Sequence, residues 1–352
     1  MRRLVPIALL CAVAGLAHET LTTTVLFDRE IVRILDKHCV MCHAENGPSF
    51  PLVTYEQTWL QKRPIRADVI ARHMPPWAAV SGYGQFANEN SLTLRETQFV
   101  ISWVEGLGPR NAGTVFTNTA AAGAARPKDV QAHIDFDAWQ LGEPQLKRQL
   151  PPSTIEPQLS EVRRTVVDLG LSAERKLHAL EFMPSDRRVV RAAFFTVQET
   201  GQWIGSWTPW YGFMSLPKGV AYRLSAGSHV VAEIHYRGIK ERVIDRGTLG
   251  LHFADQPSPD LVSDIVLEGK TRLAADTNVV QLLPALSAGV KSIEVSARKP
   301  DGGTEVLLYA KDIPADWPTP YILKEPVRLP RGTVLSVTGG VRLTVSAYRA
   351  RK

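Results

Sequence analysis

The chain has 352 residues, of which 44% are hydrophobic and 22% are charged, and its formal net charge is +6. This composition is typical of a globular protein and excludes a disordered or coiled-coil chain. The length predicts about two domains of roughly 100–200 residues. Because the positive charge is small and dispersed, the sequence predicts no nucleic-acid partner.

The first residues have the pattern of a secretory signal peptide. Arg2 and Arg3 precede an apolar stretch, and Gly15-Leu16-Ala17 places small residues before a cleavage site. We therefore expect a signal peptide over residues 1–17 and a periplasmic or secreted protein. A retained anchor is the alternative, but the apolar stretch is shorter than the ~20 residues of a spanning helix. The mature chain is expected to have no stable membrane span.

Residues 26–109 show helical patterns. Thr93-Leu94-Arg95-Glu96 is a capping-box sequence, and Pro64 is placed to open a helix within residues 57–72. Apolar residues recur at helical spacing just before the first mature cysteine, at Leu26, Phe27, Ile31, Ile34 and Leu35. The pattern predicts an all-α domain over residues 26–109.

The remainder of the chain is expected to be β-structured. Residues 110–127 are rich in Ala, Gly, Thr and Asn and predict a flexible linker. Short strand-like runs broken by Pro, Gly and Asp then continue to the C-terminus. They predict one or two jelly-roll-like β-sandwiches, with subdomains at residues 128–255 and 256–352. The predicted runs are 188–198, 229–237, 248–254, 290–298, 305–309 and 334–348.

Two cysteines remain after the signal peptide, which contains Cys11. They are Cys39 and Cys42, and His43 follows directly. This is the attachment pattern of a c-type haem, in which the thiols form thioethers to the porphyrin and the histidine binds iron. A zinc site would need further Cys or His ligands, and a thioredoxin-like pair would need a βαβ context. The sequence therefore predicts one covalent haem c.

The second axial ligand is expected in the run from Arg72 to Trp77. Met74 is the candidate, because two prolines follow it and stiffen the loop. Methionine ligation raises the haem potential and suits electron transfer. His73 is the alternative ligand. His38 is expected to be a surface residue or a neighbour of a haem propionate.

Several segments carry a resemblance to a known family. Residues 34–43, 51–56, 74–77 and 84–92 resemble the cytochrome c domain of exported bacterial fusions with a copper type II, ascorbate-dependent monooxygenase-like domain. Residues 139–144, 216–221, 230–236, 250–253 and 300–302 resemble the copper half, which is related to peptidylglycine α-hydroxylating monooxygenase. The resemblance implies two β-sandwich subdomains, each with a copper site.

Most copper ligands that the resemblance implies are absent from this chain. The family's His-His pair falls on Arg191 and Ala192, while His235 matches the third ligand of that copper. The His-x-His of the second copper falls near residues 285–289, which contain no histidine. Copper needs about three or four converging N or S ligands, so bound copper is not expected and His235 is only a residual ligand position.

These observations predict an exported electron-transfer haem protein rather than an independent catalyst. Its partner would be a redox protein or a small electron donor or acceptor, and the β-region would serve for docking or binding. Two alternatives stay open: a haem-linked copper monooxygenase acting on an organic substrate, and a haem sensor or peroxidase in which Met74 leaves the iron.

Overall fold

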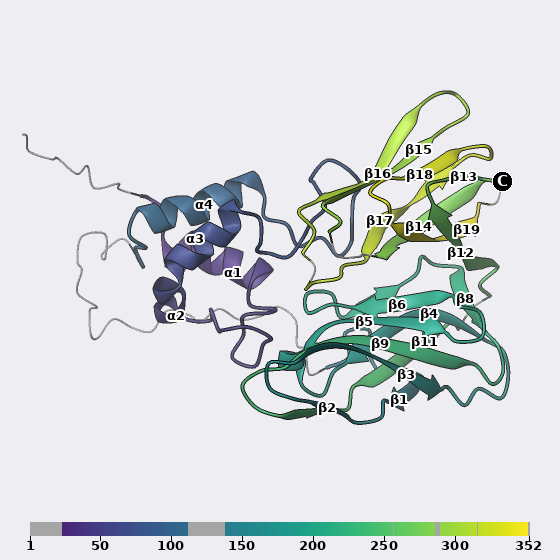
Figure 1. Cartoon of the computed structure of the whole chain (residues 1–352), viewed down its shortest axis with the longest axis horizontal. Helices are drawn as coiled ribbons and strands as arrows, with labels where there is room; N and C mark the ends of the chain where they lie inside the picture. Colours follow the sequence, from purple (N-terminus) through teal and green to yellow (C-terminus); the bar gives the residue numbers. More distant parts are fainter. Residues whose placement is uncertain (1–22, 112–137, 256, 286–288, 315, 351–352) are drawn as a thin grey trace, which may run out of the picture.

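The computed structural model describes residues 23–111, 138–255, 257–285, 289–314 and 316–350. The predicted signal peptide and nearly all of the predicted linker lie outside these ranges. Of the described residues, strands account for 42% and helices for 14%. Figure 1 shows the helices on one side of a larger β-region.

The helical part contains four short α-helices in the described ranges. A π-helical turn at Phe27–Ile31 leads into them. The predicted capping box is present, because the Thr93 hydroxyl accepts from the Glu96 N–H at 3.1 Å and the Glu96 carboxylate accepts from the Thr93 N–H at 2.8 Å. None of the described helices is long and apolar enough to cross a membrane. The helices are α1 (Val32–His38), α2 (Tyr55–Leu60), α3 (Lys62–Ile70) and α4 (Leu94–Glu105).

One nine-stranded sheet runs through both halves of the β-region. Its strand order is β1-β11-β4-β8-β12-β19-β14-β17, and β7 pairs with β4. Every neighbouring pair is antiparallel except β8 and β12, whose parallel pairing joins the two halves of the sheet. The strands are β1 (Leu146–Gln149), β4 (Arg175–Met183), β7 (Phe213–Ser215), β8 (Val220–Leu224), β11 (Thr248–Phe253), β12 (Asp260–Glu268), β14 (Thr277–Ala285), β17 (Tyr321–Leu329) and β19 (Arg342–Arg349).

Two four-stranded sheets pack on the long sheet, one on each half. The first has the order β3-β9-β5-β6 and the second β13-β18-β15-β16. The first comprises β3 (Ser160–Asp168), β5 (Val190–Val197), β6 (Trp203–Trp207) and β9 (His229–Arg237). The second comprises β13 (Lys270–Arg272), β15 (Ser292–Arg298), β16 (Thr304–Lys311) and β18 (Val334–Val337). A two-stranded ribbon adds β2 (Ser153–Ile155) and β10 (Val243–Asp245).

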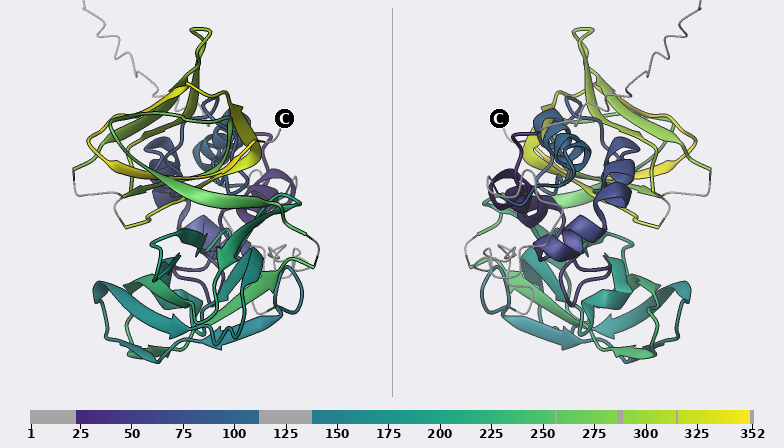
Figure 2. Two further views of the ribbon diagram at one scale, coloured as in Figure 1. Left: turned by 90° about the vertical axis from the view of Figure 1, so that its right-hand side faces the viewer. Right: turned by 90° about the vertical axis from the view of Figure 1, so that its left-hand side faces the viewer.

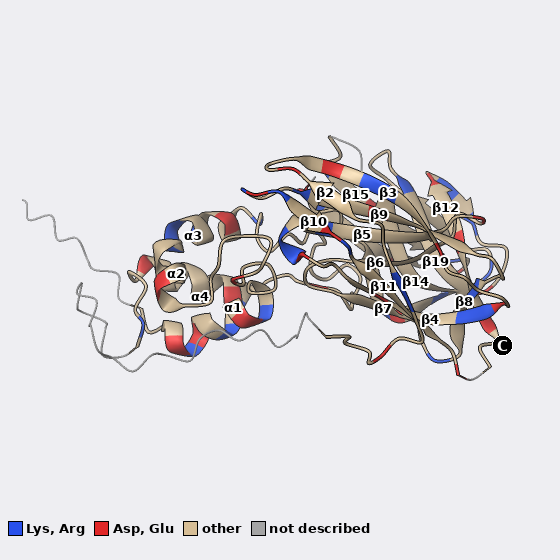
Figure 3. Cartoon of the chain, turned by 90° about the horizontal axis from the view of Figure 1, so that it is seen from below, with Lys and Arg blue, Asp and Glu red and all other residues tan. Residues whose placement is uncertain are grey.

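Each half therefore forms a β-sandwich with its own apolar core, as predicted for the C-terminal part. The first core joins buried residues of both sheets, such as Leu180, Phe195 and Leu251. The second does the same with Leu282 and Val295. Figure 2 shows the two sandwiches one above the other, with the helices over one side of both. In the view of Figure 3, basic and acidic residues are interspersed on the strands and the helices.

The prediction of an all-α cytochrome c domain over residues 26–109 is wrong. The helices are short, and residues 71–93 contain no helix. Within that segment, residues 77–88 form an irregular stretch with turns and two isolated β-bridges, here called the strap. Ala79 and Phe86 of the strap form β-bridges with β16 and β17, which are the edge strands of their sheets. Edge strands expose unpaired N–H and C=O groups, and the strap satisfies some of them instead of coiling into a helix.

Candidate functional site

The two cysteines and the histidine lie on one turn that continues α1. Here residues 39–43 are called the Cys–His turn. The Cys39 N–H donates to the Leu35 carbonyl at 2.8 Å, and the N–H groups of Cys42 and His43 donate to the Cys39 carbonyl at 3.0 and 2.9 Å. Both cysteines are free thiols. The turn thus presents two unpaired thiols and an imidazole within five residues.

His43 is held in a defined orientation by the loop that follows it. Its Nδ1 lies 2.8 Å from the Phe50 carbonyl oxygen, and its ring lies edge-on to the Phe50 ring at 4.7 Å between centroids. Because a carbonyl only accepts, Nδ1 carries the proton and Nε2 keeps a free lone pair. Burial lowers the pKa of His43, which favours the neutral imidazole. A neutral imidazole oriented through its other nitrogen is the form that binds a metal.

The surroundings of the thiols also fit a haem c. Burial raises the pKa of Cys39 to about 12, with a smaller contribution from Cys42, and burial raises the pKa of Cys42 to about 11. Both groups are therefore disfavoured as thiolates, the form that binds a bare metal ion. A thioether carries no charge and is not penalised by burial in this way. The donor set thus suits covalent haem attachment.

The β-region packs against the Cys–His turn. Met41 and Cys42 are each less than one-tenth exposed and form a small apolar cluster with Trp210. Tyr211 and Trp317 pack against this cluster. Cys42 is therefore enclosed between the helices and the β-region.

Two arginines of the first sandwich bind backbone carbonyls in and beside the turn. Arg187 donates through Nη2 to the Met41 carbonyl at 3.1 Å, and Arg191 donates through Nη1 to the Pro48 carbonyl at 2.9 Å. The Arg191 guanidinium also lies over the Trp317 ring, 4.6 Å from its centroid. Burial lowers the pKa of Arg191 to about 10, so it stays charged at neutral pH.

The two candidates for the distal ligand differ in their surroundings. The His73 side chain is 70% exposed, and its Nδ1 lies 3.5 Å from an Asp68 carboxylate oxygen. Met74 is half-buried, and the Met74–Pro75 peptide bond is cis. The chain reaches Met74 after Arg72, which has a left-handed φ of 57° at the end of α3. The structure thus leaves the His73 side chain largely in solvent and Met74 half-buried.

His38 is not a surface residue, which corrects one of the two positions expected for it. It is 6% exposed. Its Nδ1 lies 3.2 Å from Asn90 Oδ1, and its Nε2 lies 3.3 Å from Glu96 Oε1. His38, just before the Cys–His turn, therefore contacts both Asn90 and the first turn of α4.

His235 lies on β9, opposite Ala192 of β5. Its Nε2 is 3.1 Å from Glu233 Oε1, and Arg164 donates to the other Glu233 oxygen at 2.7 Å. No group of three or more His, Cys, Asp or Glu side chains that could hold a metal ion occurs among the described residues. The structure thus brings His235 to a glutamate and an arginine.

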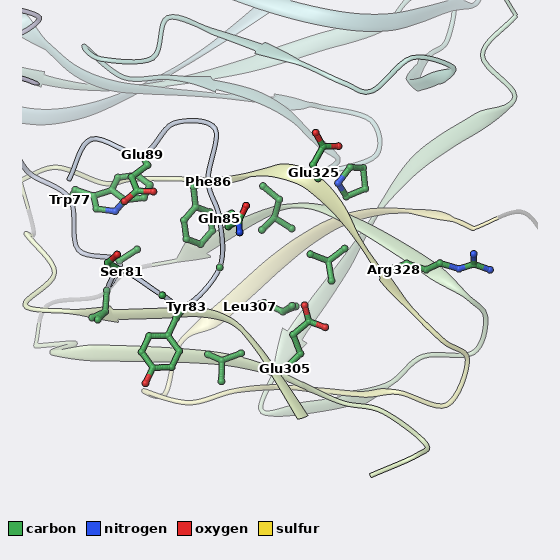
Figure 4. Close-up of a pocket in the computed structure, with 18 residues that line it drawn as sticks. Trp77, Ser81, Tyr83, Gln85, Phe86, Glu89, Glu305, Leu307, Glu325 and Arg328 are labelled. Atoms are coloured by element: carbon green, nitrogen blue, oxygen red, sulfur yellow. The ribbon is translucent and has the colours of Figure 1, made fainter. Parts of the chain in front are cut away.

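A groove of about 820 Å³ lies elsewhere, between the strap and strands β16 and β17. Figure 4 shows Trp77 and Phe86 of the strap beside it, with Glu305 and Arg328 on the strands. None of the predicted site residues lines this groove.

Sequence reasoning missed the residues that hold the Cys–His turn from outside. Phe50, Arg187 and Trp317 belong to no motif, and Arg187 and Trp317 lie more than a hundred positions from the turn in the sequence. No local sequence pattern identifies these residues, because most of their contacts with the turn span long stretches of sequence.

Comparisons with known proteins add little. No protein-family model matches the chain, and no curated protein matches it. Solved structures with partial similarity include the major capsid protein P2 from bacteriophage PM2, at 9% identity and a TM-score of 0.24, which covers 57% of this chain and 98% of that one. Another is the CUB1-EGF-CUB2 domain of human MASP-1/3, at 8% identity and a TM-score of 0.17, over 57% and 98% of the two chains. With TM-scores this low, neither similarity carries an argument about fold or function.

Proposed function

We propose that this is an exported electron-transfer protein with one covalent haem c. Cys39 and Cys42 would hold the haem through thioethers, His43 would be the proximal iron ligand and Met74 the distal one. When bound, the haem supplies one-electron redox chemistry. The observation that carries the proposal is the Cys–His turn itself, in which two free thiols accompany an imidazole with an available Nε2.

The residues around the turn support a closed redox site rather than an open reaction site. The Phe50 carbonyl orients His43, and Trp210 keeps water from Cys42. Exclusion of water and a fixed ligand orientation are means by which proteins tune a haem potential. The partner in this proposal is a redox protein or a small electron donor or acceptor.

Copper is not part of the proposed function. At the family's copper position, Arg191 binds a carbonyl beside the Cys–His turn and His235 is engaged by Glu233. A single imidazole does not make a copper site.

Covalent attachment is the first test of the proposal. The full chain is produced in a bacterial host that matures c-type haem, denatured and analysed by mass spectrometry. The wild-type chain should carry the mass of one haem, whereas the double variant Cys39→Ser, Cys42→Ser should carry none. Cys11→Ser is the matched control, because Cys11 precedes the predicted mature start, and it should keep the haem. A wild-type chain that emerges without haem would contradict the proposal.

A further inference from the structure

The strap connects the candidate distal ligand to the second sandwich. It begins three residues after Met74 and is bonded on both of its sides to edge strands. Four backbone hydrogen bonds of 2.7–3.0 Å join it to β16 and β17: Val80 N–H to Tyr309 O, Lys311 N–H to Ala78 O, Ala87 N–H to Ile322 O, and Lys324 N–H to Gln85 O. The strap is thus built into both sheets of that sandwich.

Aromatic packing fixes the end of the strap nearest Met74. Trp77 is 7% exposed and belongs to the core of the second sandwich. Its ring lies 5.7 Å from that of Phe86 and 5.4 Å from that of Tyr321, which is the spacing of stabilising edge-to-face pairs. Trp77 is therefore the point at which this segment enters the β-region (Figure 4).

The connection from Trp77 back to Met74 is short and stiff. Only Pro75 and Pro76 separate the two residues, and proline fixes the backbone φ angle. The Trp77 N–H also donates to the Pro75 carbonyl at 2.8 Å. A displacement of Trp77 therefore also displaces Met74, because the backbone between them has little conformational freedom.

The far end of the strap is bonded to the second sandwich and leads to a contact with His38. Asn88 is 1% exposed; its amide donates to the Pro320 carbonyl at 2.7 Å, and its Oδ1 accepts from the Ile322 N–H at 3.1 Å. Two residues later, Asn90 contacts His38, the residue before Cys39. The strap and Asn90 thus connect the second sandwich to Met74 at one end and to His38, beside the Cys–His turn, at the other.

We propose that the second sandwich, acting through Trp77 and Asn88 of the strap, holds Met74 in place as the distal ligand. This inference rests on the proposed function. Trp77 and Asn88 are positioning residues, since they act on the ligand through the strap. Because docking to β16 and β17 has already ordered the loop, Met74 binds without the conformational entropy cost of ordering a free loop. The placement of Met74 would thus depend on a domain outside the helices.

The test compares spectra of the haem-loaded, full-length protein. Trp77→Ala should lose the methionine–iron absorption band of the oxidised form. Its reduced form should bind carbon monoxide, whereas the reduced wild-type protein should not, because the population in which Met74 is not a ligand rises. Trp77→Phe keeps an aromatic ring in the cluster and should retain the band.

Leu335→Ala is the matched control. Leu335 is fully buried in the same core, but it lies on β18, which pairs with β13 and β15 rather than with the strap. This variant should melt earlier than the wild-type protein yet keep the band below its melting temperature. If Trp77→Ala is not recovered folded, Asn88→Ala is judged by the same criteria.

The outcomes separate the two proposals. A wild-type protein without haem, or without the methionine band, overturns the proposed function and this inference with it. A wild-type protein with the band, beside a folded Trp77→Ala protein of unchanged spectrum, overturns this inference alone. Loss of the band in Leu335→Ala as well would also overturn it, because any loss of core packing would then have the same effect.

Discussion

At the scale of single residues, Glu233 is the contact that engages His235, the residual copper-ligand position. It accepts from His235 on one side and from Arg164 on the other. The hydrogen bond from His235 is the main cause that holds the pKa of Glu233 at about 2; burial opposes this shift and Arg164 adds to it. The side chain at the residual copper-ligand position therefore acts here as a hydrogen-bond partner of a carboxylate.

This pairing predicts a pH-dependent contribution to stability. Because the pKa of Glu233 is lower in the folded state than its usual 4.5, its stabilisation is present above pH 4.5 and is lost as the pH falls towards 2. We expect Glu233→Gln to lower the free energy of unfolding at pH 7 by about 1 kcal/mol or less, since the group is partly exposed and screened. The difference in the free energy of unfolding between Glu233→Gln and the wild-type protein should be smaller at pH 3 than at pH 7.

Urea unfolding of both proteins at pH 7 and pH 3 measures this difference. Glu325→Gln, at an exposed position on β17, serves as the control and should leave the stability unchanged at both values. If Glu233→Gln lowers the free energy of unfolding by the same amount at pH 7 and at pH 3, the loss does not come from the charged form of Glu233 and the prediction is wrong.

At the scale of elements, the Cys–His turn depends on a neighbouring strand and the turn before it. Arg187 and Arg191 each donate from the first sandwich to a backbone carbonyl in or beside the turn. A hydrogen bond from a charged group to a buried carbonyl contributes about 1.5–3 kcal/mol. The arginines therefore hold the turn and its loop against the sandwich.

Replacing either arginine by alanine should loosen the loop at residues 44–50. We expect each variant to lose about 1.5–3 kcal/mol of stability and to be cleaved faster by protease within that loop. Arg188→Ala is the matched control, because Arg188 pairs instead with Asp186 and Glu241. Mass analysis of the fragments locates the cleavage. Equal cleavage in Arg187→Ala and Arg188→Ala would show that the contact to Met41 does not hold the loop.

Local sequence patterns predicted several of the elements, because the causes of those elements are local. The capping box at Thr93 and the strands around His229–Arg237 follow from side chains a few positions apart. The strap could not be predicted in this way. Asn88 donates a hydrogen bond to Pro320, 232 positions away. From the sequence alone, the apolar residues of the strap are equally compatible with a small helical domain.

At the scale of the whole molecule, three bodies share one candidate site. The helices supply the Cys–His turn, the first sandwich covers it with Trp210 and the arginines, and the second sandwich binds the strap that leads to Met74. Asn88 joins the two sandwiches, because its carbonyl also accepts from the Trp210 indole N–H at 3.2 Å, and Asn90 then contacts His38 of α1. Motif spacing predicted the candidate ligands, but it contained no information on these long-range supports.

The absorption spectrum of the purified full-length protein, with and without carbon monoxide, tests the central claim most directly. The account predicts a six-coordinate haem whose reduced form does not bind carbon monoxide. Met74→Ala should open the iron to carbon monoxide and lower the reduction potential, while His73→Ala should change neither. A wild-type haem that binds carbon monoxide freely, or a Met74→Ala protein with an unchanged spectrum, would contradict ligation by His43 and Met74.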